Sequence, residues 1–507
     1  MSSRLLQARN RPWSCDHRLP RLRVAHVTSK VNRKSKKHAE TRVFGTHEPK
    51  AAVLYPPRVI PPPRPLSLPK FLISFIRNPL RVLPEAVYHE PVFQYRAGPN
   101  TITWVTAPDL VKAVLLDRRE EFPKTPIERR VLGPLFGNGI LTSDGADWRW
   151  QRQTVSPLFR HGELLQFVPC VVATAETVVA EWRGSKPGTP QRIDRAMADA
   201  TFRVISETVL PGGDLYVRAA VERANSDYLL PISWAIAYAI LGLPTWLPHP
   251  GKRAMRRSER ALRSSLAEMV RARRATPCNR HDLFARLLRA ANPETGEPMS
   301  NEQLVDNVLT FLSAGHETTA RALTWALYLV ARAPEWGSRI AEEVAQVTGG
   351  APVTAAHLDR LQVVGQVLKE SMRLFPPVPV LTRIARGDVE IGGRRLAGGT
   401  LVVMPIYAIH RHRRLWADPD RFDPDRFAPE HEARYSRYQF MPFGAGPRIC
   451  VGASFAMIEA TAMLATLVRA ARFQVPDGYV PIPISRVTLR PKGGMPLKVW
   501  LREALSL

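Results

Sequence analysis

The sequence predicts a mainly α-helical fold with a smaller β-rich part, and three observations predict it. A capped run that begins at Ser300 continues for about 33 residues, which as a helix would be roughly 50 Å long. Further helical runs cover most of the chain after residue 105. β-Branched and aromatic residues dominate two short segments, 92–95 and 101–105, which we predict to be strands.

Residues 1–64 form a basic, proline-rich head that we predict to be disordered. The head contains fifteen Lys and Arg against three Asp and Glu, and it ends in the stiff linker YPPRVIPPPRP at 55–65. Because no further linker or repeat follows, we expect residues 66–507 to form one domain. A buried prosthetic group would help to organise a domain of this length.

Three helices are predicted from local start and stop signals. The longest begins at Ser300, where Gln303 completes a capping-box pattern, and it ends before Pro334. A second helix runs from about Leu358 to Leu374, and a third from Ala453 to about Ala471. The third helix follows directly after a cysteine, which places that cysteine at a helix N-terminus.

The most apolar stretch, residues 228–248, carries no charge over 21 residues. Its prolines at 231 and 244 leave a central segment of 12 residues, which is too short to span a bilayer. We therefore predict no transmembrane anchor. Two interpretations stay open for this stretch: peripheral contact with a membrane surface, or helix ends packed in the core.

The formal net charge of +27 indicates an anionic partner, which could be nucleic acid, lipid or an acidic protein. The sequence has no zinc-finger or RNA-binding signature, so we expect no nucleic-acid partner. Four scattered cysteines without a CxxC pair exclude a disulfide framework and a zinc site. They favour a cytoplasmic location, with the arginine-rich head leaving a mitochondrial presequence as the alternative.

Cys450 lies in the segment FMPFGAGPRICVG and is the cysteine with the most informative surroundings. A helix N-terminus stabilises a thiolate, which is the form that binds metals. Gly446 and Gly452 suit a tight loop that approaches a flat ligand closely. Phe443 could cover the sulfur, and Arg448 offers a bidentate fork for a carboxylate.

Three roles are open to Cys450: an inert core residue, a nucleophile or a metal ligand. A nucleophile needs a nearby base, and no signature links His410 or His412 to this cysteine. The glycine-containing turns on both sides argue against an inert residue. Metal ligation is therefore the favoured interpretation.

The pattern Phe443-x-x-Gly446-x-x-x-Cys450-x-Gly452 resembles the heme-binding loop of the cytochrome P-450 family of heme-thiolate monooxygenases. Four further motifs occur in that family's order: DWRWQR, SAGHETTA, KESMR and FDPDRF. The resemblance covers residues 66–507 and implies the cytochrome P-450 fold, with heme b between a long central helix and the cysteine loop. It also implies that Cys450 is the axial ligand of the heme iron.

The motif SAGHETTA lies within the longest predicted helix. The resemblance implies that small Ala314 and Gly315 leave room for dioxygen, and that Glu317 and Thr318 relay protons. A packing notch is the alternative for the small residues. The Thr318 hydroxyl can also bond back to a helix carbonyl and open a local kink. This octet is very similar to that of the fatty-acid-hydroxylating bacterial branch.

The remaining motifs supply a structural network and contacts to the heme. The resemblance implies that Glu370 and Arg373 of KESMR are buried together with a second arginine, Arg426 of FDPDRF, and hold the heme loop. Taken alone, Glu370 and Arg373 would be read as a surface ion pair. The resemblance also implies a set of residues that contact the heme or its propionates: Trp148, Arg152, Arg383, Phe443, Arg448 and Gly452.

The implied activity is insertion of one oxygen atom of O2 into a lipophilic substrate, which could be a fatty acid, a terpenoid or a steroid-like molecule. The substrate pocket that the resemblance implies is apolar and includes Phe311, Leu312, Val380 and Val487. Electrons would come from a separate ferredoxin or flavodoxin-type donor with its reductase, and acidic donors suit the positive charge of the chain. The head lacks a microsomal anchor, which suggests a soluble, bacterial-type member.

Two alternatives from other classes stay open. The first is a reductase-independent thiolate-heme peroxygenase or isomerase, against which the intact Glu317–Thr318 pair argues. The second is a non-catalytic heme sensor, in which the dioxygen notch would have no purpose.

Overall fold

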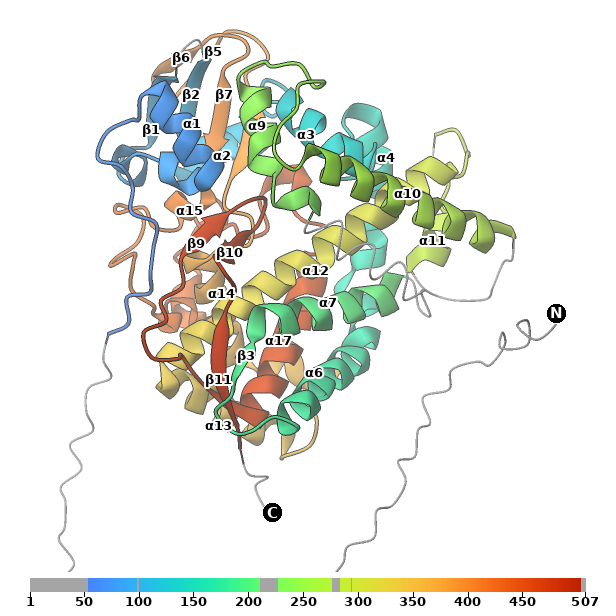
Figure 1. The fold of residues 1–507 in the computed structure, drawn as a ribbon, viewed down its shortest axis with the longest axis vertical. Coiled ribbons are helices and arrows are strands. Elements are labelled where there is room, and N and C mark those ends of the chain that lie inside the picture. Colours follow the sequence, from blue (N-terminus) through green and yellow to red (C-terminus); the bar gives the residue numbers. More distant parts are fainter. Residues whose placement is uncertain (1–52, 98–99, 210–226, 276–282, 293, 503–507) are drawn as a thin grey trace, which may run out of the picture. The chain divides into compact units, whose positions relative to one another are not determined.

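The computed structural model of the 507-residue chain describes residues 53–97, 100–209, 227–275, 283–292 and 294–502. The chain divides into two units, Met1–Lys50 and Ala51–Leu507, and the description below concerns the second. The predicted disorder of residues 1–50 lies outside the described residues. The second unit has the predicted class, in which helices dominate and the strands form several small sheets (Figure 1).

The α-helices of the described residues are α1 (Leu68–Arg77), α2 (Pro108–Lys112), α3 (Pro126–Phe136), α4 (Gly145–Val155), α5 (His161–Leu164), α6 (Val168–Arg183), α7 (Ile193–Val209), α9 (Ile232–Ile240), α10 (Lys252–Ala275), α11 (Leu283–Arg289), α12 (Asn301–Arg332), α13 (Pro334–Thr348), α14 (Gln362–Leu374), α15 (Ile406–Ile409), α16 (Pro429–Glu432) and α17 (Ala453–Ala470). The strands are β1 (Val92–Ala97), β2 (Asn100–Val105), β3 (Pro190–Arg192), β4 (Leu381–Ile384), β5 (Val389–Ile391), β6 (Arg394–Leu396), β7 (Leu401–Met404), β8 (Ala471–Gln474), β9 (Pro483–Ser485), β10 (Leu489–Pro491) and β11 (Pro496–Leu501).

Helix α12 runs through the middle of the second unit (Figure 1). Its predicted start is confirmed: the Ser300 hydroxyl accepts a hydrogen bond from the Gln303 amide at 3.1 Å, and the Gln303 side chain accepts one from the Ser300 amide at 2.9 Å. Almost every residue from Leu304 to Val330 is buried, because α7, α10, α14 and α17 all pack against this helix. The helix thus forms the axis of the core.

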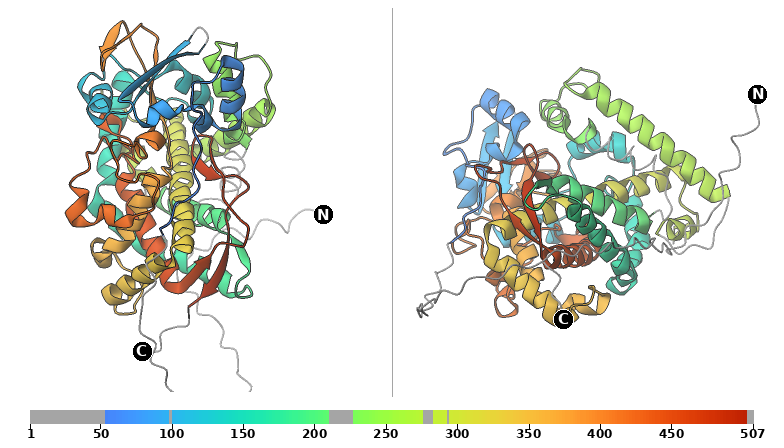
Figure 2. Two further views of the ribbon diagram at one scale, coloured as in Figure 1. Left: turned by 90° about the vertical axis from the view of Figure 1, so that its left-hand side faces the viewer. Right: turned by 60° about the horizontal axis from the view of Figure 1, so that its bottom comes forward.

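The largest sheet has the strand order β1-β2-β7-β4. β1 pairs antiparallel with β2, in the register Val92↔Val105, and these are the two predicted strands. β2 pairs parallel with β7, and β7 pairs antiparallel with β4. This sheet lies beside one end of α12, as the left view of Figure 2 shows. Smaller sheets pair β10 with β9, β5 with β6, and β3, β11 and β8 in that order.

Two predicted helix boundaries agree with the structure and one was wrong. α17 begins at Ala453, three residues after Cys450, as predicted. The helix predicted from Leu358 begins instead at Gln362, because a 3-10 turn at Ala355–Arg360 precedes it and Leu361 leaves the helical region at ψ 67°. Its end at Leu374 is as predicted.

The proline-rich segment at 55–65 is part of the packed unit, which differs from the predicted head of residues 1–64. The Leu54 carbonyl accepts a hydrogen bond from the Phe422 amide at 2.9 Å. The buried Val59 amide donates to the Tyr407 hydroxyl at 3.1 Å. A proline-rich segment without internal hydrogen bonds is free to take such partners, so this segment docks on the domain rather than linking to it.

Two helical segments, His161–Arg183 and Ala453–Ala470, are long and apolar enough to cross a membrane by length and composition alone. They pack against each other, and 67% of the second is buried inside the protein. Both therefore serve as core helices of this fold. The apolar stretch at 228–248 forms the short helix α9, as the prolines predicted.

Candidate functional site

Cys450 lies in the loop between a short 3-10 turn, Gly446–Arg448, and α17. The Cys450 amide donates to the Phe443 carbonyl at 2.9 Å, which closes the loop. Gly446 has a φ of +73°, and a Cβ at this position would collide with the Leu115 carbonyl. Glycine is therefore required here by both backbone conformation and close packing.

Cys450 is an exposed residue of this loop. Burial raises the pKa of the Cys450 thiol, while the Gly452 amide, which donates to the sulfur, and the charge of Arg152 act in the opposite direction. Arg152 is held next to the loop because its guanidinium donates to the Ile449 carbonyl at 2.8 Å. Burial outweighs these two effects.

One face of α12 is less buried than the rest of that helix. Ala314 is exposed, Gly315 and Thr318 are half-buried, and Phe311 lies one turn earlier on the same side. The Thr318 hydroxyl donates to the Ala314 carbonyl at 2.7 Å, which is the predicted back-bond. Leu312 is only 1% exposed and lies about 200° around the helix from Ala314. Its role as a pocket residue stays a prediction.

Gly315 serves the packing of α12 against α7. A Cβ at Gly315 would lie 2.9 Å from the Ile205 side chain, so a larger residue would push α7 away. The packing notch, which was the alternative to a dioxygen notch, thus has a direct structural basis. The exposed residue on this side of the helix is Ala314.

The ring of Phe159 connects the exposed face of α12 to the cysteine loop. Its centroid lies 5.7 Å from that of Phe311, and a Cβ at Gly452 would lie 3.9 Å from the same ring. Phe159 thus lies near both Phe311 of α12 and Gly452 of the cysteine loop.

A group of cations lies next to the cysteine loop. The Arg448 guanidinium lies 4.1 Å from the centroid of the Trp148 ring and forms an ion pair with Asp144. Burial lowers the pKa of Lys124, Arg383 and Arg448; the charge of Arg448 lowers the pKa of Lys124 and Arg383 further, while the neighbouring Glu128 acts in the opposite direction on all three. Such a group can bind the carboxylates of a ligand. Lys124 was not predicted, because a single lysine in a loop carries no sequence signal.

Glu317 and Thr318 point to different neighbours, although they are adjacent in the sequence. The Glu317 carboxylate forms ion pairs with Arg321 and Arg490, both at 3.0 Å, and accepts a hydrogen bond from Thr488 at 2.9 Å. Burial alone would raise the pKa of Glu317, but the two arginines outweigh it and lower the pKa to about 2. Glu317 is thus an anchored carboxylate, and the predicted proton-relay pair is separated in this structure.

The residues of the predicted buried network lie together. Glu370 and Arg373 form a bidentate ion pair with a shortest distance of 2.6 Å and no solvent exposure, and Arg426 approaches Glu370 at 3.7 Å. The Arg373 guanidinium also donates to the His410 carbonyl at 2.8 Å. The His410 ring in turn accepts a hydrogen bond from the Met441 amide at 3.0 Å.

His410 therefore links the buried network to the loop that leads to Cys450. Burial, with the charges of Arg373 and Arg411, lowers the pKa of His410 to about 3, so the ring is neutral and can accept the bond. Sequence reasoning considered His410 and did not select it. No local signal marks this role, because the partners lie more than 30 residues away on either side.

Two predicted pocket residues, Val380 and Val487, are partly buried against the main core. Their segments lie side by side, because the Leu489 amide donates to the Pro377 carbonyl at 2.9 Å. Phe311 on α12 is buried and contacts Phe159. All three side chains are apolar, as the predicted pocket requires.

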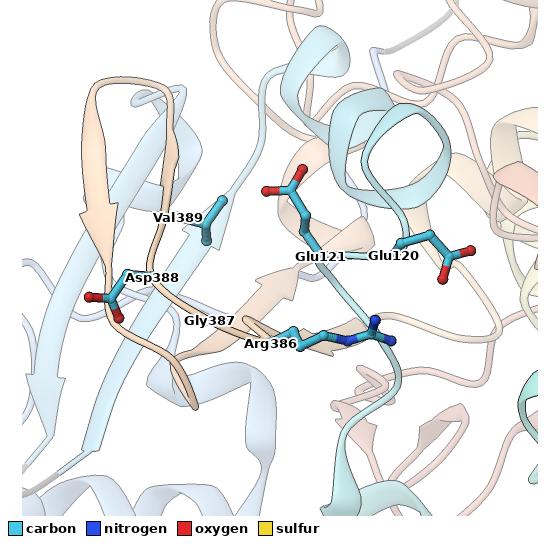
Figure 3. A pocket seen from close by; sticks show the side chains of 6 residues that line it. All are labelled: Glu120, Glu121, Arg386, Gly387, Asp388 and Val389. Atoms are coloured by element: carbon cyan, nitrogen blue, oxygen red, sulfur yellow. The ribbon is translucent and has the colours of Figure 1, made fainter.

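A surface hollow of about 350 Å³ lies elsewhere, between the segment after Asp117 and the turn that precedes β5 (Figure 3). Its lining residues are Glu120, Glu121, Arg386, Gly387, Asp388 and Val389. None of them belongs to the predicted site. Four of these six residues are charged, which does not suit a lipophilic molecule.

Comparisons with known proteins identify relatives over nearly the whole domain. The family model of cytochrome P-450 matches residues 61–497. The chain is 32% identical to cyclooctat-9-en-7-ol 5-monooxygenase of Streptomyces melanosporofaciens, over 77% of this chain and 84% of that protein. It is 31% identical to 11-oxo-beta-amyrin 30-oxidase of Glycyrrhiza uralensis, over 81% and 82%. The crystal structure of the cytochrome P-450DA heme domain superposes with a TM-score of 0.74 at 26% identity, covering 88% of this chain and 98% of that one.

Proposed function

The chain belongs to the cytochrome P-450 family, and on that premise we propose that it is a monooxygenase of a cyclic terpenoid that receives its electrons from a separate protein. Its relatives are monooxygenases and oxidases, so the class of enzyme is an oxidoreductase. The substrate and the electron donor are the parts that we propose.

The residues around Cys450 fit a heme. Cys450 offers one thiol on an exposed loop, which suits a metal that brings its other ligands with it, as heme iron does. The Gly452 amide and Arg152 stabilise its thiolate form. Lys124, Arg383 and Arg448 would bind the propionates of heme b. The bound heme supplies the activation of dioxygen.

The buried network gives the cysteine loop its position. Arg373 on α14 donates to the His410 carbonyl, and the His410 ring accepts from the Met441 amide, two residues before Phe443. Phe443 in turn accepts the hydrogen bond from the Cys450 amide. This path runs from a fully buried ion pair to the ligand, so Glu370, Arg373 and Arg426 act as positioning residues.

Thr318 is the residue placed to handle a proton on the exposed face of α12. Its hydroxyl donates to the Ala314 carbonyl, and half-burial leaves its oxygen reachable. Glu317 would have to leave Arg321, Arg490 and Thr488 before it could deliver a proton, and with a pKa of about 2 it carries none at neutral pH. We therefore assign the proton-handling role to Thr318 and an anchoring role to Glu317.

The observation that carries the substrate proposal is the similarity to relatives named for cyclic terpenoids, cyclooctat-9-en-7-ol and 11-oxo-beta-amyrin. The apolar side chains of Phe311, Val380 and Val487 are consistent with such a substrate. A fatty acid is the second candidate, because the motif SAGHETTA resembles that of fatty-acid hydroxylases.

The test uses the heme-loaded full-length protein. We expect a cyclic diterpene alcohol to change the heme absorption spectrum at micromolar concentration, and a hexadecanoic acid of matched concentration to leave it unchanged. A spectral change with the fatty acid alone would overturn the terpenoid proposal. Turnover with purified ferredoxin or flavodoxin and its reductase then tests the electron donor, and product formation with peroxide alone would favour the reductase-independent class.

We also propose that the enzyme is cytoplasmic, since its cysteine usage is that of a reducing compartment.

A further inference from the structure

The α3–α4 loop, residues 137–144, passes close to the N-terminal part of α12. Gly137 has a φ of +54°, and a Cβ there would collide with the carboxylate of Asp306. A Cβ at Gly139 would lie 2.8 Å from the Asp306 carbonyl oxygen and 2.9 Å from the Thr310 hydroxyl. Glycine is required at both positions, because no side chain fits between the loop backbone and the helix.

Two buried side chains of α12 hold this loop through its backbone amides. The Asp306 carboxylate accepts a hydrogen bond from the Asn138 amide at 2.7 Å. The Asn307 side-chain oxygen accepts one from the Ile140 amide at 3.1 Å. Asp306 and Asn307 are 1% and 0% exposed. Since a buried N–H group without an acceptor is strongly unfavourable, these two bonds fix the loop on the helix.

Gln151 of α4 completes the attachment and is itself fully buried. Its side-chain oxygen accepts from the Asn307 amide group at 2.9 Å, and its side-chain nitrogen donates to the Asn138 carbonyl at 3.0 Å. The Asn307 amide group also donates to the Gln303 carbonyl at 2.9 Å. Both donors of Asn307 thus have acceptors, which directs its oxygen to the Ile140 amide.

Arg263 of α10 joins the same carboxylate to α3. Its guanidinium forms an ion pair with Asp306 at 2.8 Å and donates to the Leu135 carbonyl, near the end of α3, at 3.0 Å. α3, α10 and α12 pack against one another (Figure 1). The place of the loop therefore depends on one buried carboxylate that is bound from two sides.

The same loop holds two of the cations that lie next to the cysteine loop. The Lys124 ammonium donates to the Leu141 carbonyl. The Arg448 guanidinium donates to the Ser143 carbonyl at 3.1 Å and pairs with Asp144. Lys124 precedes α3, whereas Arg448 lies 305 residues after Ser143. The α3–α4 loop is therefore a common support for two cations from distant parts of the chain.

We propose that Asp306 and Asn307 are positioning residues for the propionates of the heme. By holding the α3–α4 loop on α12, they keep Lys124 and Arg448 where carboxylates can bind. An ammonium group has three N–H donors and a guanidinium five, so bonds to the loop exhaust neither cation. This inference rests on the heme site of the proposed function. The alternative is a role in joining the three helices alone.

The first experiment measures how fast the heme-loaded full-length protein loses its heme to an excess of apomyoglobin. We expect Asp306→Asn to lose heme roughly tenfold faster, because a hydrogen bond to a charged group contributes about that factor. Asn307→Leu removes the second acceptor and should act in the same direction. Unchanged rates in both variants would overturn the proposal.

Asp194→Asn is the matched control, because Asp194 has the same chemistry elsewhere in the fold. Its carboxylate pairs with Arg192 at 2.9 Å and accepts from the Met495 amide at 2.8 Å. We expect Asp194→Asn to lower the urea midpoint as Asp306→Asn does, but to leave the rate of heme loss unchanged. Equal acceleration in the two variants would show a general loosening of the fold and overturn the proposal.

The second experiment replaces heme with its dimethyl ester, which has no carboxylates. In protein reconstituted with the ester, the difference in loss rate between wild type and Asp306→Asn should disappear, because the cations then have no propionates to hold. A tenfold difference that persists with the ester would refute the positioning role. A wild type without a thiolate band in its carbon-monoxide spectrum would instead refute the heme site itself.

Discussion

The anchoring of Glu317 predicts that this residue contributes more to stability than to proton delivery. The pKa of its carboxyl is lowered from 4.5 to about 2 by Arg321 and Arg490, after burial has acted in the opposite direction. At 1.36 kcal/mol per pKa unit, this corresponds to about 3 kcal/mol of differential stabilisation of the ionised form. We expect Glu317→Gln to destabilise the protein at pH 7 by about that amount, because it leaves two buried arginines without their counterion.

The way in which the stabilising contribution of Glu317 depends on pH follows from the direction of its pKa shift. A carboxyl whose pKa is lower in the folded than in the unfolded protein stabilises the fold above the unfolded value, near 4.3, and this contribution disappears as the pH falls towards 2. The difference in unfolding free energy between wild type and Glu317→Gln should therefore be constant between pH 6 and 8 and shrink below pH 4. Urea unfolding, followed by fluorescence and by the heme absorption, measures it.

Thr318→Ala is the matched control, because it changes the next residue of the same helix and removes one hydrogen bond. We expect a loss of about 1 kcal/mol in stability but a large diversion of electrons to hydrogen peroxide. Glu317→Gln should show the reverse pattern. If Glu317→Gln keeps its stability and loses coupling between electron use and product as Thr318→Ala does, the anchoring role is refuted and Glu317 is the proton donor.

Three further predictions concern other parts of the site. Cys450→Ser should abolish the thiolate band in the reduced, carbon-monoxide-bound spectrum, and a retained band would disprove the ligand assignment. Arg373→Met should lower the melting temperature and the heme content together, since it breaks a fully buried ion pair and the path to the cysteine loop; unchanged heme content in the folded variant would contradict the positioning role. Burial raises the pKa of Glu459 well above its usual range. The folded protein therefore keeps a proton on this carboxyl that the unfolded chain loses above about pH 4. Because of this difference, the stability of the fold decreases as the pH rises. Glu459→Gln should thus raise the melting temperature more at pH 8 than at pH 5, and an equal shift at both would show that the carboxyl is not buried in its neutral form.

Local signals in the sequence were sufficient for the parts of the fold that depend on neighbouring residues. The capping box at Ser300 and the glycines around Cys450 act within a few residues, and both are found where they were predicted. The docking of the proline-rich segment depends instead on the Tyr407 hydroxyl, which lies 348 residues from Val59. No property of the segment itself indicates such a partner.

In the site, too, the residues that belong to local motifs could be predicted, and those placed by distant parts of the chain could not. The motifs identify Cys450, Trp148 and Arg448, because each belongs to a pattern with fixed spacing. Lys124 joins the cation group only through the fold, in which its loop approaches Arg383 and Arg448. Leu312 was predicted together with Ala314, but a residue two positions before Ala314 points to almost the opposite side of the helix.

In the motif SAGHETTA, residues that are adjacent in the sequence contact different parts of the protein because they lie on a helix. Successive residues of an α-helix are rotated by about 100°, so His316, Glu317 and Thr318 must face three different neighbours. The His316 ring packs edge-on against Phe202 of α7, and Glu317 reaches Arg490 and Thr488 near β10. Thr318 alone shares the side of Ala314. Glu317 therefore ties α12 to the C-terminal strands, while the Thr318 hydroxyl stays on the side of Ala314.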